Sequence, residues 1–155
     1  MDIQIRKAET ADVLEITRLL RSLGLFAHIN AEEIQSTQKR VLNHLSLCIS
    51  DDSHLILVAQ PPGVEIAVHW QPYLILTGPE GYVSELFVRE EFRGQKIGSQ
   101  LLEAVKVEAR NRGCFHLMLL NLRKRDSYKR QFYPKHGWEE RPDAANFVFQ
   151  FVKQA

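Results

Sequence analysis

Apolar and polar residues recur along the chain with two different periods, which predict helices and strands in a mixed order. From Val13 to Leu23, apolar residues return every third or fourth position, as on one face of a helix, and Gly24 is a typical stop. Stretches such as 54–60 instead have the aliphatic, β-branched content of a strand. The predicted strands cover residues 3–6, 54–60, 64–77, 82–88, 115–122, 138–141 and 146–152, and the predicted helices cover residues 10–24, 30–44, 97–113 and 126–137.

The order of these elements predicts an α/β (α+β) fold built on one mixed, mostly antiparallel sheet. Short turns join residues 54–60, 64–77 and 82–88, which we expect to form an antiparallel meander, and Pro72 should bend or interrupt the middle strand. The nearly continuous apolar run 115–122 predicts a strand buried on both faces. We expect about six or seven strands and about four helices in a single domain that spans the whole chain, residues 1–155.

Composition and charge narrow the classes of function. The 155 residues include 20 basic and 19 acidic ones, a balance that does not favour a nucleic-acid-binding protein. The N-terminus has no apolar signal-peptide core and no window approaches a membrane span, so we expect a cytoplasmic protein without a membrane partner. Cys48 and Cys114 stand far apart and are expected to be reduced thiols. Neither these cysteines nor the six histidines show a metal-ligand spacing, so we expect no metal.

The segment EFRGQKIGSQLLEAVK (91–106) predicts a turn that leads from a strand directly into a helix. Backbone N–H groups in a first helical turn have no partner within the helix, and they attract anions such as phosphate. Gly94 and Gly98 leave room for a bulky anion, while Arg93 and Lys96 add positive charge. The spacing differs from GxxxxGK[ST] and from GxGxxG, which argues against a P-loop and a dinucleotide fold. An ordinary strand–turn–helix unit that binds nothing is the alternative.

Two motifs, in this order along the chain, resemble those of the GNAT superfamily of N-acetyltransferases. The stretch ELFVREEFRGQKIGSQLL (85–102) is similar to the family's cofactor motif, Gln/Arg-x-x-Gly-x-Gly/Ala. Arg93 fills its first place and Gly98 its last, while Lys96 stands where glycine is usual. The stretch FYPKHGW (132–138) is similar to the family's FYxxxGF. The resemblance covers about 70 residues by motif, and the order of elements extends it over the whole chain.

The resemblance implies a GNAT-like sheet whose fourth and fifth strands, here 82–88 and 115–122, splay apart to hold acetyl-CoA. The pantetheine arm would pair with the fourth strand as an added strand does, and the pyrophosphate would bind the turn before the helix. A side chain at Lys96 is expected to point outward and to store backbone strain if the turn needs a positive φ. The implied cofactor-binding residues are Leu86, Phe87, Val88, Arg93, Gly94, Gln95, Lys96, Ile97, Gly98 and Ser99, with Asn121 and Asp126 as alternatives for one further contact.

Acyl transfer to an amine needs a base that takes a proton from the ammonium, a donor for the thioester oxygen and an acid for the departing thiolate. By the resemblance, Glu85 is the candidate base, directly or through water, and an N–H of Phe87 or Val88 is the candidate donor. Tyr133, four residues before Gly137, is the candidate acid. The alternatives are a solvated strand carboxylate at Glu85 and an aromatic core residue at Tyr133.

The resemblance implies an N-acetyltransferase that uses acetyl-CoA as co-substrate and acetylates a primary amine by direct attack in a ternary complex. The connection 24–30 has no carboxylate cluster, so a small amine, an amino acid and a protein amine all stay open as acceptors. The alternative is a non-catalytic module of the same fold that binds acetyl-CoA or CoA as a sensor or interaction partner. An exposed edge near the final strand would support a homodimer, which is common in similar proteins.

Overall fold

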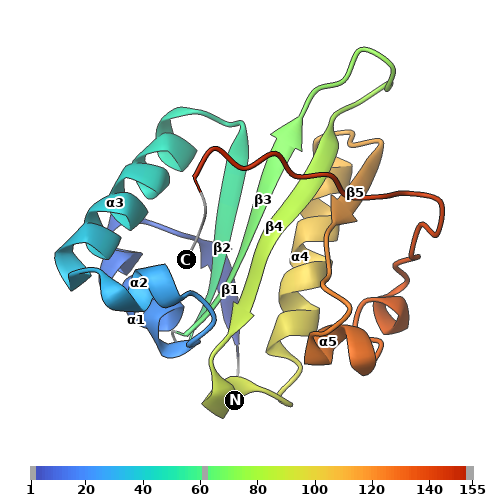
Figure 1. Ribbon diagram of the computed structural model, residues 1–155. Helices are drawn as coiled ribbons and strands as arrows, with labels where there is room; N and C mark the ends of the chain where they lie inside the picture. Colours follow the sequence, from blue (N-terminus) through green and yellow to red (C-terminus); the bar gives the residue numbers. More distant parts are fainter. Residues whose placement is uncertain (1–2, 61–62, 153–155) are drawn as a thin grey trace. The chain divides into compact units, whose positions relative to one another are not determined.

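Five strands form one sheet in the order β1-β2-β3-β4-β5 in the computed structural model, which describes residues 3–60 and 63–152 (Figure 1). Neighbouring strands from β1 to β4 run antiparallel, and β5 lies parallel to β4. The expected mixed, mostly antiparallel sheet is therefore confirmed, with fewer strands than expected among the described residues. The strands are β1 Gln4–Lys7, β2 His54–Gln60, β3 Val64–Gln71, β4 Glu80–Val88 and β5 His116–Leu119.

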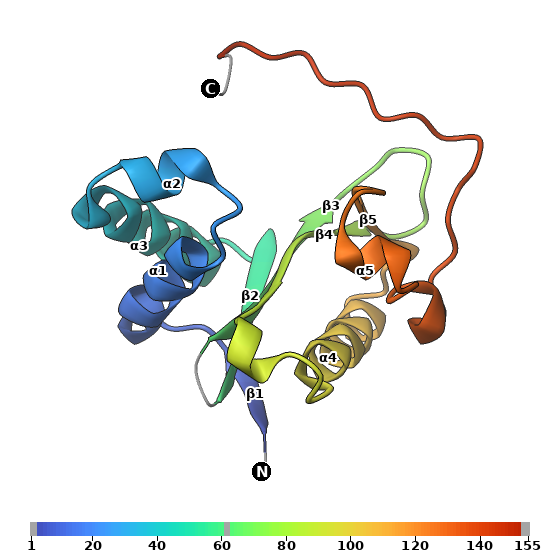
Figure 2. The ribbon, with the colours of Figure 1, turned by 60° about the horizontal axis from the view of Figure 1, so that its bottom comes forward.

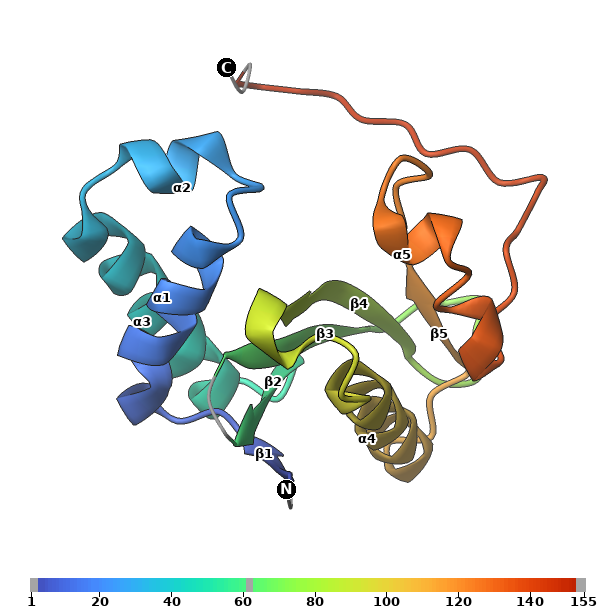
Figure 3. The same cartoon turned by 90° about the horizontal axis from the view of Figure 1, so that it is seen from below.

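Helices lie on both faces of this sheet, with α1 and α3 on one face and α4 on the other (Figure 3). The chain divides into a first unit, residues 1–119, which holds the sheet, and a second unit, residues 120–155. The expectation of a single domain stays a prediction. No helix in residues 3–60 or 63–152 is both long and apolar enough to span a membrane. The helices are α1 Val13–Ser22, α2 Ala27–Ala31, α3 Ile34–Ser50, α4 Ile97–Asn111 and α5 Asp126–Lys129, and short 3-10 turns cover Thr10–Asp12, Glu90–Phe92 and Pro134–His136.

The first unit has an apolar layer on each face of the sheet. Side chains alternate along the strands, so one set packs under α1 and α3 and the other packs against α4. Burial of each leucine or isoleucine stabilises the fold by about 1.5–3 kcal/mol, which fixes α4 and its N-terminal turn against the sheet. The layer under α1 and α3 contains Ile16, Val41, Leu45, Ile56, Val58 and Ala67. The buried stripe of α4 consists of Ile97, Leu101, Leu102, Val105 and Ala109.

Two strands end earlier than the sequence pattern predicts. β3 stops at Gln71, immediately before Pro72, which has no N–H to donate to a sheet ladder. The interruption predicted at Pro72 is confirmed, and residues 72–79 form the connection to β4. β5 keeps four residues of the predicted 115–122, and all four are half-buried, so the prediction of burial on both faces is wrong. The physical reason is that β5 is an edge strand, with β4 as its pairing neighbour.

The second long helix begins later than predicted, at Ile34, and continues to Ser50. Both Glu32 and Glu33 have extended backbones, which separate the short α2 from α3. The Glu32 carboxylate accepts a hydrogen bond from Thr37 Oγ1 at 2.7 Å and pairs with Arg40. A carboxylate that holds two side chains of the following helix stabilises this break, which propensity alone does not reveal.

The second unit is short of regular structure. α5 covers four residues, Asp126–Lys129, and the predicted helix to 137 is broken at Gln131, whose φ is 55°. A positive φ cannot continue a right-handed helix, and Pro134 lacks an N–H donor. The chain resumes as a 3-10 turn that ends at Gly137, where φ is 81°.

The two strands predicted in the second unit, 138–141 and 146–152, are absent among its described residues, 120–152. A strand forms only where a neighbour satisfies its backbone groups, and the alternating pattern of 146–152 carries no information about a neighbour. Its aromatic side chains are consequently exposed rather than packed. The exposed fractions are 92% for Phe147, 83% for Phe149 and 93% for Phe151.

Candidate active site

β4 and β5 pair over half of the length of β4 and then separate. The parallel pairs run from Glu80 with His116 to Val83 with Leu119, where β5 ends. β4 continues through residues 84–88, so this half of the strand lies beyond its last pair with β5 (Figure 1). The first unit therefore has an opening beside this half of β4, on the edge where β5 pairs with the other half, and the expected splay of the two strands stays a prediction.

The backbone of β4 presents alternate peptide groups to this opening. Arg89 N–H donates to the Gly63 carbonyl at 2.9 Å, so the backbone groups of Arg89 point toward β3. Peptide groups alternate in direction along an antiparallel ladder. Val88, which precedes Arg89, and Leu86 therefore direct their N–H and carbonyl groups away from β3. The Val88 carbonyl accepts from Arg93 Nε at 3.2 Å on that side. Of the two candidate oxyanion donors, this alternation favours Val88 over Phe87.

The turn after β4 leads directly into α4, as expected (Figure 2). The first hydrogen bond of the helix runs from Gln100 N–H to the Lys96 carbonyl, at 3.1 Å. The N–H groups of Ile97, Gly98 and Ser99 precede it and have no carbonyl to reach within the helix. These three groups lie at the positive end of a helix of 15 residues, where such groups favour an anion, and their role toward the cofactor stays a prediction.

Side chains hold the shape of this turn. Gln95 Nε2 donates to the Glu91 carbonyl at 2.9 Å, and the backbone N–H of Arg93 donates to the Glu90 carbonyl at 3.1 Å. Gly94 has a φ of 77°, which an L side chain rarely adopts. The turn is thus built from local bonds that leave the helical N–H groups available.

Lys96 caps α4 in the left-handed conformation, with φ 63° and ψ 11°. A non-glycine residue in this region stores about 1–2 kcal/mol of strain, because its Cβ crowds the following carbonyl oxygen. The family motif has glycine at this place, so the discordant residue in the sequence coincides with a strained residue in the structure. The sequence predicts strain at Lys96 if its φ is positive, and the structure shows that this φ is positive.

Lys96→Gly should raise the free energy of unfolding by about 1 kcal/mol, because glycine adopts this conformation without strain. Acetyl-CoA affinity should tighten or stay unchanged. Thermal melting and isothermal titration measure the two quantities. Lys96→Ala is the matched control, since it keeps the Cβ and removes the ammonium group. A marked loss of affinity in both variants would mean instead that the ammonium group itself binds phosphate.

A one-residue bulge in β4 sets the direction of the candidate base. Glu85 lies opposite Ala67 of β3, and the following pair skips Ser84. Ala67 belongs to the layer under α1 and α3, so its cross-strand neighbour Glu85 faces the same side. Ser84 shares this side, because its Oγ lies 3.0 Å from Nε2 of His69, two residues after Ala67 on β3.

Two carboxyl groups on this face have raised pKa values. Glu65 lies two residues before Ala67 and is 1% exposed; burial, and then the charge of Glu85, raises its pKa to about 8. Its Oε1 has no hydrogen-bond partner among the described residues. Glu85 is accessible to solvent, yet the surrounding protein desolvates its carboxyl group enough to raise its pKa above the ordinary value. An accessible carboxyl with a raised pKa is a suitable proton acceptor near neutral pH.

Comparison with protein families identifies the fold and the chemistry. The model of the acetyltransferase (GNAT) domain matches residues 51–140, which include β2 to α5 and the turn before α4. The chain belongs to the GNAT family. It is therefore an acyltransferase, and the resemblance to this family is confirmed.

Curated relatives of this GNAT protein are N-acetyltransferases. It is 28% identical over 152 residues to the thialysine N-ε-acetyltransferase of Sus scrofa, covering 88% of this chain and 89% of the relative. It is 38% identical over 76 residues to the aminoalkylphosphonate N-acetyltransferase of Salmonella typhimurium, covering 48% of each chain. These relatives support acetyl transfer to an amine as the family activity.

Solved GNAT-like structures share the fold at low identity. A transcriptional regulator from Bacillus halodurans superposes with a TM-score of 0.82 at 20% identity, over 97% of this chain and 100% of that one. A ribosomal-protein-alanine N-acetyltransferase from Brucella melitensis gives a TM-score of 0.75 at 19% identity, over 97% and 100% of the two chains. At these identities the likeness establishes the fold alone.

The remaining predicted site residues of this GNAT protein belong to the second unit. Tyr133 precedes the 3-10 turn, its ring packs edge-on against Phe132 and Trp138, and burial raises the pKa of its hydroxyl. Asn121 Oδ1 accepts a hydrogen bond from Ser127 Oγ at 3.0 Å. The roles assigned to Tyr133 and Asn121 stay predictions.

An aspartate at the start of a predicted helix, such as Asp126 in 126–137, is a typical N-cap, but the structure does not place Asp126 there. Asp126 is the first residue of α5, Arg125 occupies the cap position, and the Asp126 side chain is 91% exposed. Its carboxylate lies 3.7 Å from Arg130 Nε, one turn later, which is the contact that its position in the first turn favours. Its role toward the cofactor stays a prediction.

Sequence reasoning missed Glu65 and the bulge at Ser84. A signal for Glu65 was available, since a single carboxylate in the apolar strand VEIAV must lie on one of two covered faces. The bulge left no such signal, because it depends on how β4 pairs with β3. Beside these residues, the rings of Phe26 and Phe87 meet edge-on with centroids 5.6 Å apart, which gives this face an apolar wall near α2.

Proposed function

We propose that this GNAT protein acetylates the primary amine of a small aliphatic molecule, such as a lysine-like amino acid, with acetyl-CoA as donor. The observation that carries the proposal is the accessible carboxyl of Glu85, on the half of β4 that lies beyond its last pair with β5, with the buried Glu65 on the same face. The Glu85 carboxylate favours a cationic acceptor, and the wall of Phe26 and Phe87 suits an aliphatic chain.

The chain's residues fit acetyl-CoA at two places. The outward N–H and carbonyl of Leu86 and the carbonyl of Val88 suit the amides of a pantetheine arm, and the N–H groups of residues 97–99 suit a pyrophosphate. Arg93, whose Nε reaches the Val88 carbonyl, would lie between them. When bound, acetyl-CoA supplies a thioester whose carbonyl carbon accepts the amine.

Each residue then has a defined task in a ternary complex. Glu85 removes a proton from the ammonium group of the acceptor, directly or through water, because only the free amine has a lone pair. Val88 N–H donates to the carbonyl oxygen as negative charge grows there. The new C–N bond forms, the C–S bond breaks, and Tyr133 gives a proton to the sulfur that leaves. The attacking nitrogen then loses its second proton, which passes through solvent and restores the Tyr133 hydroxyl.

The names of the relatives guide the choice of acceptor. Thialysine N-ε-acetyltransferases from three mammals match 79–88% of this chain, and an aminoalkylphosphonate N-acetyltransferase matches half of it. Both names describe small molecules with an aliphatic primary amine. We therefore rank such amines above protein N-termini and lysine side chains of proteins.

Thiol release from acetyl-CoA, measured with a panel of amines, tests the proposal. Thialysine, lysine and an aminoalkylphosphonate should be acetylated faster than peptides. Tyr133→Phe should lower kcat by about 10²-fold, as loss of a general acid does. Tyr128→Phe is the matched control, because the Tyr128 hydroxyl already donates to Glu140 at 2.9 Å.

Two outcomes would contradict the proposal. If Tyr133→Phe and the wild type had equal rates, Tyr133 would not be the general acid. If isothermal titration detected acetyl-CoA binding but no amine or peptide were acetylated, the protein would be a binding module and not an enzyme.

A further inference from the structure

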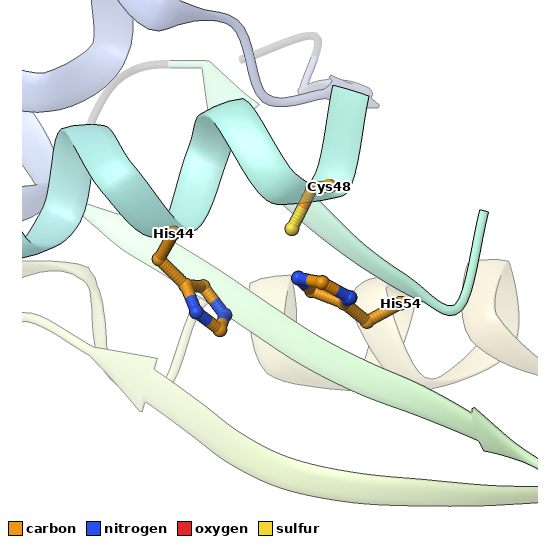
Figure 4. A group of neighbouring side chains, drawn as sticks. All are labelled: His44, Cys48 and His54. Atoms are coloured by element: carbon orange, nitrogen blue, oxygen red, sulfur yellow. The ribbon is translucent and has the colours of Figure 1, made fainter. Parts of the chain in front are cut away.

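Three side chains of metal-ligand type meet between α3 and β2, in the first unit (Figure 4). His44 and Cys48 lie four residues apart on α3, so they share one face of the helix. His54 is the first residue of β2. One potential ligand atom from each residue lies within 4.8 Å of the other two, and all three residues are half-buried.

We propose that His44, Cys48 and His54 form a binding site for Zn²⁺. Two imidazole nitrogens and one thiolate are a donor set that this borderline-soft ion favours over Mg²⁺ or Ca²⁺. Solvent would fill the fourth position, because the three residues are only half-buried. The sequence-based statement that no cysteine or histidine shows ligand spacing is wrong, since His44 and Cys48 are spaced four apart on one helix.

The state of His54 points to a ligand rather than to ordinary packing. Its Nε2 is buried without a hydrogen-bond partner among the described residues, although a buried polar atom usually has one. Its Nδ1 lies 2.9 Å from Ser53 Oγ, a partner that can fix the ring's orientation, as outer partners of metal-bound histidines do. The missing partner of Nε2 is explained if a cation takes that place.

A neighbouring histidine supports the cluster from the sheet. His69 pairs with His54 across β2 and β3, and the two rings stack with centroids 5.3 Å apart and an interplanar angle of 16°. His69 Nε2 is engaged with Ser84 Oγ at 3.0 Å, so it is a support and not a ligand. This stack restricts the His54 ring to the position that faces α3.

The cluster must close slightly to hold the ion. Bond lengths of about 2.0–2.1 Å to nitrogen and 2.3 Å to sulfur place tetrahedral ligand atoms about 3.4–3.6 Å apart. The ligand atoms, which lie within 4.8 Å of one another, must therefore approach, and changes in the side-chain torsion angles are the expected route. Burial raises the pKa of the Cys48 thiol to about 11, so the metal-free thiol keeps its proton. On binding, the S–H bond breaks, a sulfur–metal bond forms and the proton passes to solvent.

The consequence of binding is a cross-link between the C-terminal half of α3 and the sheet. A ligand that binds only the folded state stabilises it by an amount that grows with its concentration. The cross-link also reaches the strand of the candidate base, through His69 and Ser84. The proposed site is structural, and it does not depend on the proposed acetyl transfer.

Titration of the protein with Zn²⁺, followed by isothermal calorimetry and thermal melting, tests the site. We expect one ion per chain, a higher melting temperature and no comparable effect of Mg²⁺. Cys48→Ser and His54→Gln should each weaken binding by 10²-fold or more, whereas the matched controls Cys114→Ser and His28→Gln should bind as the wild type does. At saturating Co²⁺, a thiolate charge-transfer band should appear in the wild type and in His54→Gln and be absent from Cys48→Ser.

A measurement on the wild-type protein covers the case in which a variant fails to fold. Zn²⁺ should protect Cys48, but not Cys114, from alkylation, as peptide mass spectrometry reads out. The proposal is overturned by equal alkylation of Cys48 with and without Zn²⁺, or by Zn²⁺ affinity that survives Cys48→Ser unchanged. Either result would leave an adventitious surface site or none.

Discussion

Glu85→Gln should lower kcat by about 10²–10⁴-fold while the affinity for acetyl-CoA stays nearly constant. Glutamine keeps the size of the side chain but cannot take a proton from the acceptor ammonium. Surrounding protein raises the pKa of Glu85, so in the wild type kcat/KM should rise with pH through a value above the ordinary 4.5 of a glutamate. That part of the pH profile should disappear in the variant.

Glu103→Gln is the matched control, because this exposed residue of α4 pairs with Lys106 on the surface. Its kinetics should equal those of the wild type. Initial rates of thiol release at several pH values measure both variants. If Glu85→Gln kept the wild-type rate and pH profile, the base would have to be a different group or the solvent.

Glu65→Gln should make the protein more stable than the wild type at pH 8 and above, although it removes a buried charge-bearing residue. The pKa of Glu65 is about 8 in the folded protein and near its ordinary 4.5 in the unfolded chain. A raised pKa means that the folded state binds the proton more tightly. The associated stability is fully present below pH 4.5 and is lost as the pH rises to 8.

The shift of the Glu65 pKa sets an upper limit on how much this residue changes the free energy of unfolding. A difference of about 3.5 pKa units corresponds to at most about 5 kcal/mol of unfolding free energy, which is a large share of the stability of a small domain. Denaturant unfolding of the wild type and of Glu65→Gln at pH 5 and pH 8 measures it. The difference between the two proteins isolates Glu65 from other titrating groups. A difference that did not change with pH would show that Glu65 ionises normally.

Local patterns were sufficient for the parts of the site that the chain builds from neighbouring residues. The helix from Ile97 was predicted from apolar spacing, and the turn before it from Arg93, Gly94 and Gly98. Lys96 was recognised as discordant from its place in the motif, and its φ of 63° is the physical counterpart. In each case the deciding interactions lie within about one turn of the helix.

Features that depend on pairing between distant residues were beyond the sequence. His54 meets His69 because of the register between β2 and β3, and Glu85 faces the same side as Ala67 because of the bulge at Ser84. The phenylalanines of 146–152 alternate as in a strand, but this alternation does not identify a strand with which the segment would pair. These errors share one cause, which is that strand neighbours are chosen by the whole fold.

The bulge at Ser84 decides which face of the sheet each later residue of β4 occupies. If β4 had no bulge, Ser84 would lie opposite Ala67, and each later residue would move to the other face of the sheet. Glu85 would then point into the apolar layer against α4. A change of length within β4 is therefore expected to exchange one face for the other over half of the strand. The exposed start of the connection to β4, residues 72–75, can in contrast change length without altering the pairing of β4. In lineages of this protein, insertions should accumulate in that connection and be absent from β4.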